Sequence, residues 1–150
     1  MQLRKAIAGI ATLVGICAVP GSAMAACLVA ATPLVFGTLD LLSGGPNDSA
    51  ATITVTCGLG TSYSVGLDNG ANFSATRRMK AASVAAYVPY NLFSDSLHVT
   101  PWGNTIGTNT VGGTAGAFPT LLTVYGRIPA GTTPVPVDTY LDAITVTITF

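Results

Sequence analysis

The sequence contains no glutamate and few charged residues of any kind. Asp, Lys and Arg together make up 8% of the 150 residues, where about 25% is usual. After residue 25, four Lys and Arg side chains remain against six aspartates, which gives this part of the chain a net charge of −2. Because no basic stripe is present, we do not expect the protein to bind nucleic acid.

The residue groups that carry catalysis or hold metals are also lacking. The aspartates are isolated rather than paired for acid–base work, and there is no Gly-x-Ser-x-Gly motif. The single histidine, His98, has no Cys or Glu close to it in the sequence. We therefore expect a protein that is not an enzyme and binds no metal or cofactor. His98 is expected to be either exposed to solvent or hydrogen-bonded within the core.

The first 25 residues have the parts of a secretory signal peptide. Arg4 and Lys5 precede an apolar run over residues 6–19, and Ser22-Ala23-Met24-Ala25 provides the small residues of a cleavage site. The apolar run is too short to span a membrane. This pattern predicts cleavage after Ala25, export through the periplasm, and one mature domain over residues 26–150.

The cysteines indicate a disulfide bond in the exported chain. Cys17 lies in the predicted signal peptide, which leaves Cys27 and Cys57 as a pair. Closing this loop should stabilise the fold by about 3 to 4 kcal/mol. The alternative is lipidation of Cys27 after the short cleavage box that precedes it, which would leave Cys57 as an unpaired thiol.

Alternation of apolar and polar residues predicts a chain made of strands. The expected strand segments are residues 34–37, 51–57, 62–67, 72–79, 85–94, 97–100, 121–128 and 139–150, and the alternation is clearest in residues 51–57, 62–67 and 144–150. Asp68-Asn69-Gly70 predicts a tight hairpin turn. Residues 101–120 are rich in Gly, Thr and Asn and have no period, so they form a functional loop, a flexible loop or an unrecognised hairpin. About seven short strands joined by Gly and Pro turns predict an all-β antiparallel sandwich.

The most regular of these segments is the last. Ile144, Val146, Ile148 and Phe150 alternate with threonines, so the apolar side chains share one face of a strand. No later segment follows that could pair with the free edge of this strand. We therefore expect either an earlier strand or another molecule to cover that edge.

Two further groups of residues have alternative interpretations. Residues 77–80, Arg-Arg-Met-Lys, form either a solvated strand end or a contact for an anion or partner. Trp102 and Phe118, near the two ends of the loop over residues 101–120, either anchor that loop in the core or form an exposed contact surface.

Several short motifs, in their order and spacing, resemble the spore coat protein U domain family, the pilins of archaic chaperone-usher fimbriae. The resemblance covers the whole predicted mature chain. The matching motifs are Cys27 followed by Leu34-Val35-Phe36-Gly37, Ile53-Thr54-Val55-Thr56-Cys57, Arg78-Met79, Tyr90-Asn91-Leu92-Phe93-Ser94-Asp95, Trp102-Gly103, Val124-Tyr125-Gly126-Arg127-Ile128-Pro129, and Tyr140-Leu141-Asp142 leading to Phe150.

This resemblance implies an incomplete immunoglobulin-like sandwich that lacks its final strand. In this family a periplasmic chaperone fills the open groove by β-strand addition, and a neighbouring pilin replaces it as an outer-membrane usher assembles a surface fimbria. A donor strand that buries about four apolar side chains would contribute about 6 to 12 kcal/mol, comparable with the 5 to 15 kcal/mol stability of a small domain. The expected groove residues are Leu122, Val124, Ile144, Val146, Ile148 and Phe150.

One departure from the family pattern affects the expected place in a fibre. Cleavage after Ala25 leaves only Ala26 ahead of Cys27, so we expect a subunit that accepts a strand but donates none and sits at the tip or another end. Two alternatives are open. The first is a tip adhesin that binds a glycan or an apolar surface through residues 101–120. The second is a self-complemented secreted coat protein that folds without a chaperone.

Overall fold

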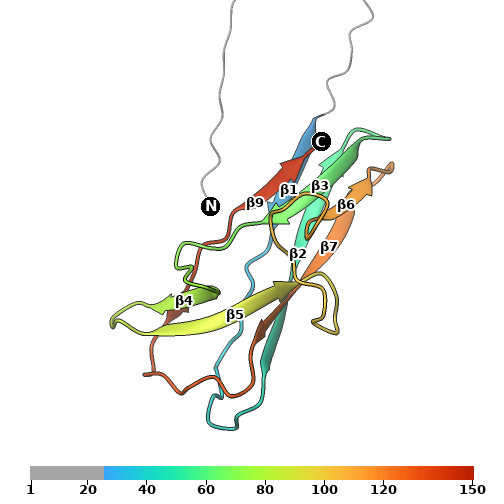
Figure 1. The fold of residues 1–150 in the computed structure, drawn as a ribbon. Helices are drawn as coiled ribbons and strands as arrows, with labels where there is room; N and C mark the ends of the chain where they lie inside the picture. The colour runs from blue at the N-terminus through green and yellow to red at the C-terminus, as the bar shows by residue number, and fades with distance from the viewer. Residues whose placement is uncertain (1–25) are drawn as a thin grey trace, which may run out of the picture.

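The computed structural model describes residues 26–150, shown in Figure 1. The predicted signal peptide, including Cys17, lies outside these described residues, which form nine strands and no helix. The strands are β1 (Cys27–Ala31), β2 (Asn47–Cys57), β3 (Ser62–Leu67), β4 (Arg77–Ala81), β5 (Tyr87–Phe93), β6 (Val111–Thr114), β7 (Thr120–Ile128), β8 (Tyr140–Leu141) and β9 (Val146–Thr149).

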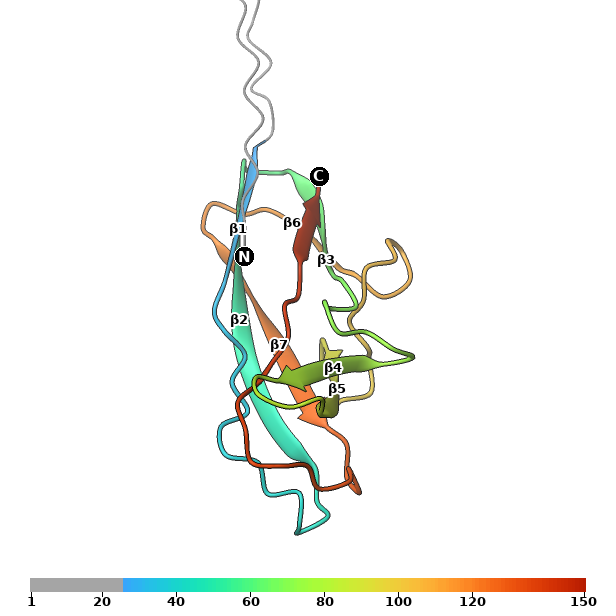
Figure 2. The same ribbon diagram turned by 90° about the vertical axis from the view of Figure 1, so that its left-hand side faces the viewer.

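The strands form two sheets in which every pairing is antiparallel. The larger sheet has the order β1-β2-β7-β5-β4-β8 and the smaller one has the order β6-β3-β9. Figure 2 shows β9 and β3 across from β1, β2 and β7. Both sheets contribute to one core, whose most buried side chains include Ile53, Val55, Val65, Val88 and Trp102. The predicted all-β antiparallel sandwich is therefore confirmed.

The long pair β2 and β7 forms the centre of the larger sheet. It runs in register from Asn47 opposite Ile128 to Val55 opposite Thr120. Ile53 and Val55 point inward from β2 and are at most 2% exposed. The alternation predicted from the sequence holds here because β-branched residues on one face of each strand pack against the other sheet.

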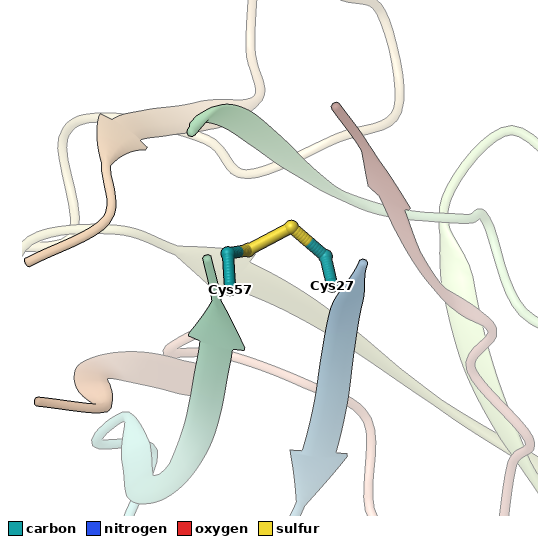
Figure 3. The surroundings of a disulfide bond; sticks show 2 residues. All are labelled: Cys27 and Cys57. Carbon is teal, nitrogen blue, oxygen red and sulfur yellow. A yellow bond between two sulfur atoms is a disulfide. The ribbon is translucent and has the colours of Figure 1, made fainter. Parts of the chain in front are cut away.

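The predicted disulfide joins β1 to β2, as Figure 3 shows. Cys27 and Cys57 occupy directly opposed positions of the two strands, with their Cα atoms 4.2 Å apart. The bond confirms the pairing expected from the sequence and occupies the sulfur that lipidation of Cys27 would need. It fixes the first strand of the described chain to a core strand.

Removing this disulfide should destabilise the protein substantially. We expect the double substitution of Cys27 and Cys57 by serine to lower the free energy of unfolding by about 3 to 4 kcal/mol, because the bond closes a loop of 30 residues in the unfolded chain. Urea unfolding followed by circular dichroism measures this loss. Wild-type protein treated with a thiol reductant is the matched control and should unfold at the same urea concentration as the variant. Equal midpoints for oxidised wild type and variant would contradict the prediction.

The first strand lies earlier in the sequence than predicted. Residues 34–37 were expected to form the first strand. The first strand of the structure is instead β1, and residues 34–37 pair with no strand in the described part of the chain. Leu34 and Phe36 do alternate inward, as their pattern suggested. They pack over Gly126 of β7, where an added Cβ would lie 2.8 Å from Leu34 Cδ1. The alternation was correct, but no neighbouring strand is available to bond with this segment.

The tight hairpin predicted at Asp68-Asn69-Gly70 is wrong. A carboxylate oxygen of Asp68 accepts hydrogen bonds from the backbone N–H groups of Gly70 and Thr145, so the turn is stabilised by the side chain. The chain then crosses to the other sheet, where β4 begins at Arg77 and pairs with β5 and β8 rather than with β3. Residues 72–76 therefore belong to a connection between sheets.

The segments around β5 and β6 also differ from the predictions. Residues 97–100 form a turn rather than a strand, with His98 at φ 59°. The segment over residues 101–120, for which several interpretations were open, contains β6, which pairs with β3. Pro89 of β5 lies opposite Arg78 of β4, and the pairing of β5 with β7 begins only at Asn91.

The terminal segment is divided between the two sheets. Residues 139–150 were expected to form one strand, but β8 pairs with β4 in the larger sheet and β9 pairs with β3 in the smaller one. The alternation continues through the crossing, because Ile144 lies between the two strands and still packs against the core. A single face of this segment therefore stays inward while its hydrogen-bond neighbour changes.

Candidate binding groove

Three sheet edges meet at one groove. The two sheets end at β1 and β8 and at β6 and β9, respectively. Residues of β1, β8 and β9 line a groove of about 1390 Å³. We call its two sides the N-wall, drawn from residues 29–42, and the C-wall, drawn from residues 134–146.

The floor of the groove is the hydrophobic core itself. Ile53 of β2, Leu67 of β3 and Val124 of β7 line it and are at most 5% exposed. Leu34 and Phe36 of the N-wall lie beside this floor, and Phe36 contacts the ring of Tyr90 edge to face at 6.1 Å. Apolar side chains inserted into the groove would therefore continue the core rather than rest on its outer surface.

The walls carry unpaired backbone groups. Within residues 26–150, β1 pairs with β2, β8 pairs with β4, and β9 pairs with β3, so each of these three strands has one free edge. Free N–H and C=O groups along a strand can pair with an added strand. The groove combines such edges on both sides with an apolar floor, which is the arrangement that β-strand addition requires.

The groove narrows where β1 and β9 approach one another. Some Cα atoms of these strands lie within 8 Å of each other, although the strands belong to different sheets. A strand inserted between two others needs about 9.4 to 9.8 Å, twice the usual spacing between strands. An occupant that pairs with both β1 and β9 therefore requires these edges to separate slightly.

The structure brings together part of the residue set expected from the sequence. Val124, Ile144 and Val146 line the groove. Leu122 and Ile148 are partly buried against the core beyond the groove lining, and Phe150 is 58% exposed. Their status as chaperone or donor contacts stays a prediction.

Sequence reasoning did not find the N-wall. Its inward apolar side chains, Leu34, Phe36, Leu39 and Leu41, all line the groove. The alternation of Leu34 and Phe36 was visible in the sequence. It suggested an ordinary paired strand, because a sequence pattern does not tell whether a neighbouring strand is present.

A polar cluster occupies one end of the groove. The Tyr90 hydroxyl donates to Asp142 Oδ2 at 2.7 Å, and the backbone N–H and side-chain amide of Asn72 both donate to Asp142 Oδ1 at 3.1 Å. Burial and the bond to Asp142 raise the pKa of Tyr90 far above its usual value, so it keeps its proton. Nearby, Asp138 accepts from the hydroxyl and N–H of Ser83, and these bonds lower the pKa of Asp138.

Arg77 lies close to the cluster around Asp142 and is buried, at 8% exposed. The interpretation of residues 77–80 as a solvated strand end is therefore wrong for this residue. Its Nε donates to the carbonyl of Asp68 at 2.8 Å, and its Nη2 donates to the carbonyls of Leu67 and Trp102 at 2.9 Å. Burial lowers the pKa of Arg77. The side chain joins the end of β3 to the start of the long loop, whereas Arg78 lies 4.3 Å from the centre of the exposed Tyr87 ring.

Trp102 and Phe118 have opposite surroundings. Trp102 is 1% exposed, and its indole N–H donates to the carbonyl of Val65 at 2.9 Å. It anchors the start of the loop and is not available as a surface contact. Phe118 is 84% exposed and is thus the member of the pair that stays accessible.

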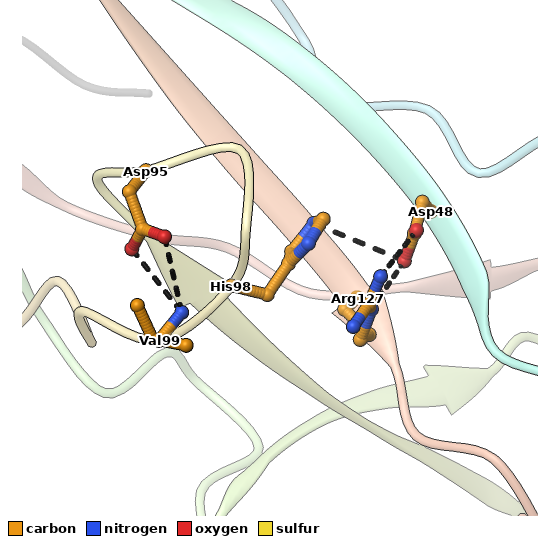
Figure 4. A network of polar contacts seen from close by, with 5 residues as sticks. All are labelled: Asp48, Asp95, His98, Val99 and Arg127. Atoms are coloured by element: carbon orange, nitrogen blue, oxygen red, sulfur yellow. Dashed lines mark hydrogen bonds and ion pairs between the residues drawn. The ribbon is translucent and has the colours of Figure 1, made fainter.

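His98 lies on the outer face of the larger sheet, away from the groove, in the cluster of Figure 4. Its side chain is 7% exposed and contacts the rings of Phe93 and Tyr125 edge to face. Nε2 lies 3.8 Å from Asp48, whose carboxylate is held by Arg127 through two bonds of 2.6 and 2.7 Å. The bond to Arg127 lowers the pKa of Asp48. Neither ring nitrogen of His98 has a hydrogen-bond partner in the described structure, so the expectation of an exposed or satisfied histidine is wrong.

Residues 26–150 contain no group of three or more His, Cys, Asp or Glu side chains placed to hold a metal ion. Nor does this part contain a helix long and apolar enough to cross a bilayer.

The two sheets and the edge-lined groove define a pilin-type β-sandwich. The sequence matches the Spore Coat Protein U domain family over residues 14–147, so the chain belongs to this family. It is 40% identical over 74 residues to Protein U of Myxococcus xanthus, a match that covers 49% of this chain and 40% of that protein. The chain therefore spans less than half the length of this relative.

A solved structure confirms the fold. A chain of the CsuC-CsuE chaperone-tip adhesion subunit pre-assembly complex, from the archaic chaperone-usher Csu pili of Acinetobacter baumannii, superposes with a TM-score of 0.59. The match covers 85% of this chain and 40% of the other, at 22% sequence identity. At that identity the similarity establishes the common fold alone.

Proposed function

We propose that the protein is a structural subunit of a chaperone-usher fimbria and accepts a strand from another polypeptide in its groove. The observation that carries this proposal is the meeting of three free strand edges, β1, β8 and β9, around an apolar floor. Family membership and the pilus complex that shares the fold support it. The proposed residue contacts are Leu122, Val124, Ile144, Val146, Ile148 and Phe150.

The proposed mechanism is β-strand addition. Alternate apolar side chains of the incoming strand enter the groove, and its backbone pairs with the free edges of the two walls. Inserting such a strand buries apolar surface on both partners and satisfies backbone groups that otherwise bond to water. The subunit passes from a periplasmic chaperone to a neighbouring pilin at an outer-membrane usher and is displayed at the cell surface.

A complementing peptide tests this proposal directly. Residues 26–150 are expressed alone and titrated with an eleven-residue peptide of alternating valine and serine, the length of residues 138–148, which run from the C-wall into β9. We expect the melting temperature to rise with peptide concentration, because a ligand that binds the folded state stabilises it. A peptide of the same composition without alternation is the control. A monomeric, cooperatively melting chain that neither peptide stabilises would instead support the self-complemented coat protein.

The position in the fibre depends on the mature N-terminus. A chain that begins at Ala26 has one residue ahead of Cys27, too few to reach a neighbouring subunit as a donor strand. The intact mass of the exported protein identifies this terminus. A mass that matches residues 26–150 supports a tip or other end position, and a longer N-terminal segment would remove that part of the proposal.

A second function, adhesion through residues 101–120, rests on exposed apolar side chains. Phe118 is 84% exposed and Ile106 is 63% exposed. Exchanging both for serine and scoring attachment of the assembled fibre to an apolar surface tests this role. Reduced attachment with unchanged assembly would separate adhesion from a purely structural subunit.

A further inference from the structure

We propose that the groove selects an occupant strand that carries a lysine or arginine facing the acidic half of the C-wall. This inference rests on the proposed strand-acceptor function and specifies the chemistry of the partner. It follows from the kind and placement of the charges that line the groove.

All charged residues among the described groove lining have the same sign. They are Asp138 and Asp142, and no Lys, Arg or His side chain lies with them. The remainder of the lining is apolar apart from a few threonines, Tyr90 and Tyr140. An occupant that is entirely apolar therefore matches the floor but leaves the two carboxylates without a complement.

The two carboxylates occupy one half of the C-wall. Along this extended segment the half-buried residues are Asp138, Tyr140, Asp142, Ile144 and Val146, and the residues between them are exposed. The inward face is thus acidic toward residue 138 and apolar toward residue 146. A strand lying alongside would meet both halves in one fixed register.

Neighbouring hydrogen bonds hold both carboxylates in place. Ser83 donates twice to Asp138, and Tyr90 and Asn72 donate to Asp142. All of these donors are neutral. They orient the acidic groups at the groove without neutralising their charge.

The described chain supplies no ion pair to these two carboxylates. The Arg–carboxylate ion pair found within residues 26–150 joins Arg127 to Asp48, on the outer face of the larger sheet. Arg77 interacts electrostatically with Asp142, but its Nε and Nη2 donate to three backbone carbonyls. Its hydrogen-bonding capacity is therefore largely committed within the core.

Covering the groove makes the missing counterion important. A strand placed over the carboxylates removes water from them, and charges without water or a partner are unfavourable. A long basic side chain on the occupant can place its charge beside the carboxylates while its methylene stem covers the apolar lining. An acidic residue at the same position would add repulsion, so the wall discriminates between occupants by charge.

A set of charged peptides tests the inference. The eleven-residue valine–serine peptide is made with lysine or with glutamate at position 3 or at position 9. When the peptide lies alongside residues 138–148, position 3 of a parallel peptide or position 9 of an antiparallel peptide falls between Asp138 and Asp142. We expect one lysine peptide to bind about 5 to 20 times more tightly than its glutamate counterpart in isothermal titration at low salt. We also expect this ratio to fall as salt is added, and the preferred position identifies the strand direction.

Matched variants assign the preference to the C-wall. Asp138→Asn and Asp142→Asn should each reduce the lysine-to-glutamate ratio, and the double variant should bring it close to one. Asp40→Asn removes the same charge from a residue that lies between N-wall residues Leu39 and Leu41 but does not line the groove. This control should keep the full ratio, and the melting temperature without peptide shows that each variant is folded.

The possible failures are distinguishable. If no peptide binds, the strand-acceptor function itself fails. If the peptides bind but lysine and glutamate forms bind equally well, the function stands and the charge inference is overturned. A preference for lysine that remains in the double variant also overturns the inference, because residues other than Asp138 and Asp142 would then select the charge.

Discussion

Val146→Asp is expected to abolish strand acceptance. Val146 is half-buried in β9, lies opposite Leu67 of β3 and lines the groove at its apolar half. A carboxylate at this position would lie in the apolar lining without a partner, which should destabilise an occupied groove by about 2 to 4 kcal/mol. The alternating valine–serine peptide should then no longer raise the melting temperature, and a chaperone complex should no longer be recovered.

A neighbouring position provides the control for this experiment. Thr147 lies in the same strand but is exposed on the opposite face, so Thr147→Asp adds the same charge outside the groove. Peptide binding by the Thr147 variant should stay within about twofold of the wild type. If the Val146 variant binds the peptide as well as the wild type does, β9 does not form part of the acceptor site.

Arg77→Met should cause a large loss of stability. The variant keeps an unbranched side chain about as long as the arginine stem but removes the donors to the carbonyls of Leu67, Asp68 and Trp102. Buried acceptors that lose their partners typically cost about 1 to 3 kcal/mol each. We therefore expect a total loss of about 3 kcal/mol or more in the free energy of unfolding, measured by urea denaturation in saturating peptide.

Arg78→Met is the matched substitution at the adjacent residue. Arg78 contacts the Tyr87 ring and donates to the carbonyl of Asn72, and the loss of these less buried contacts should cost only about 1 to 2 kcal/mol. Comparable losses for the two variants would show that the carbonyl cluster around Arg77 contributes little. A large loss for Arg77 alone would identify it as a structural core residue.

The parts of the fold that could be predicted from the sequence depend on alternation within single segments. Ile53 and Val55 in β2 and Val124 in β7 point inward as expected. The face of a strand follows from its own residues, since successive side chains point to opposite sides. The pairing of Cys27 with Cys57 was also predictable, because only two cysteines follow residue 25.

The pairing between strands could not be predicted in the same way. Residues 139–150 keep one inward face while their backbone moves from β4 to β3, and residues 34–37 alternate without any neighbour. Alternation defines which side of a strand is buried, but the identity of the adjacent strand depends on contacts distant in the sequence. This is why the groove was expected beside the last strand and residues 122–124, and its N-wall was missed.

Two charged or polar residues show a similar limit. Arg77 shares the inward face of β4 with Met79 and Ala81, a sign in the sequence that its side chain points into the core. Nothing in the sequence shows that three carbonyls surround its guanidinium. His98 becomes buried because the turn that contains it folds over Phe93 and Tyr125, a contact that no local pattern indicates.

Because β1 and β9 lie close together, we expect the distance between them to differ between the empty subunit and a subunit with a strand in its groove. Because these strands lie within 8 Å at some positions, and a third strand between them needs about 9.4 to 9.8 Å, loading must push them apart by an ångström or more. The disulfide ties β1 to β2, so the displacement falls on β9 and its partner β3. A pair of spectroscopic labels, one on β1 and one on β9, would report this distance and so distinguish empty from occupied subunits in a mixed population.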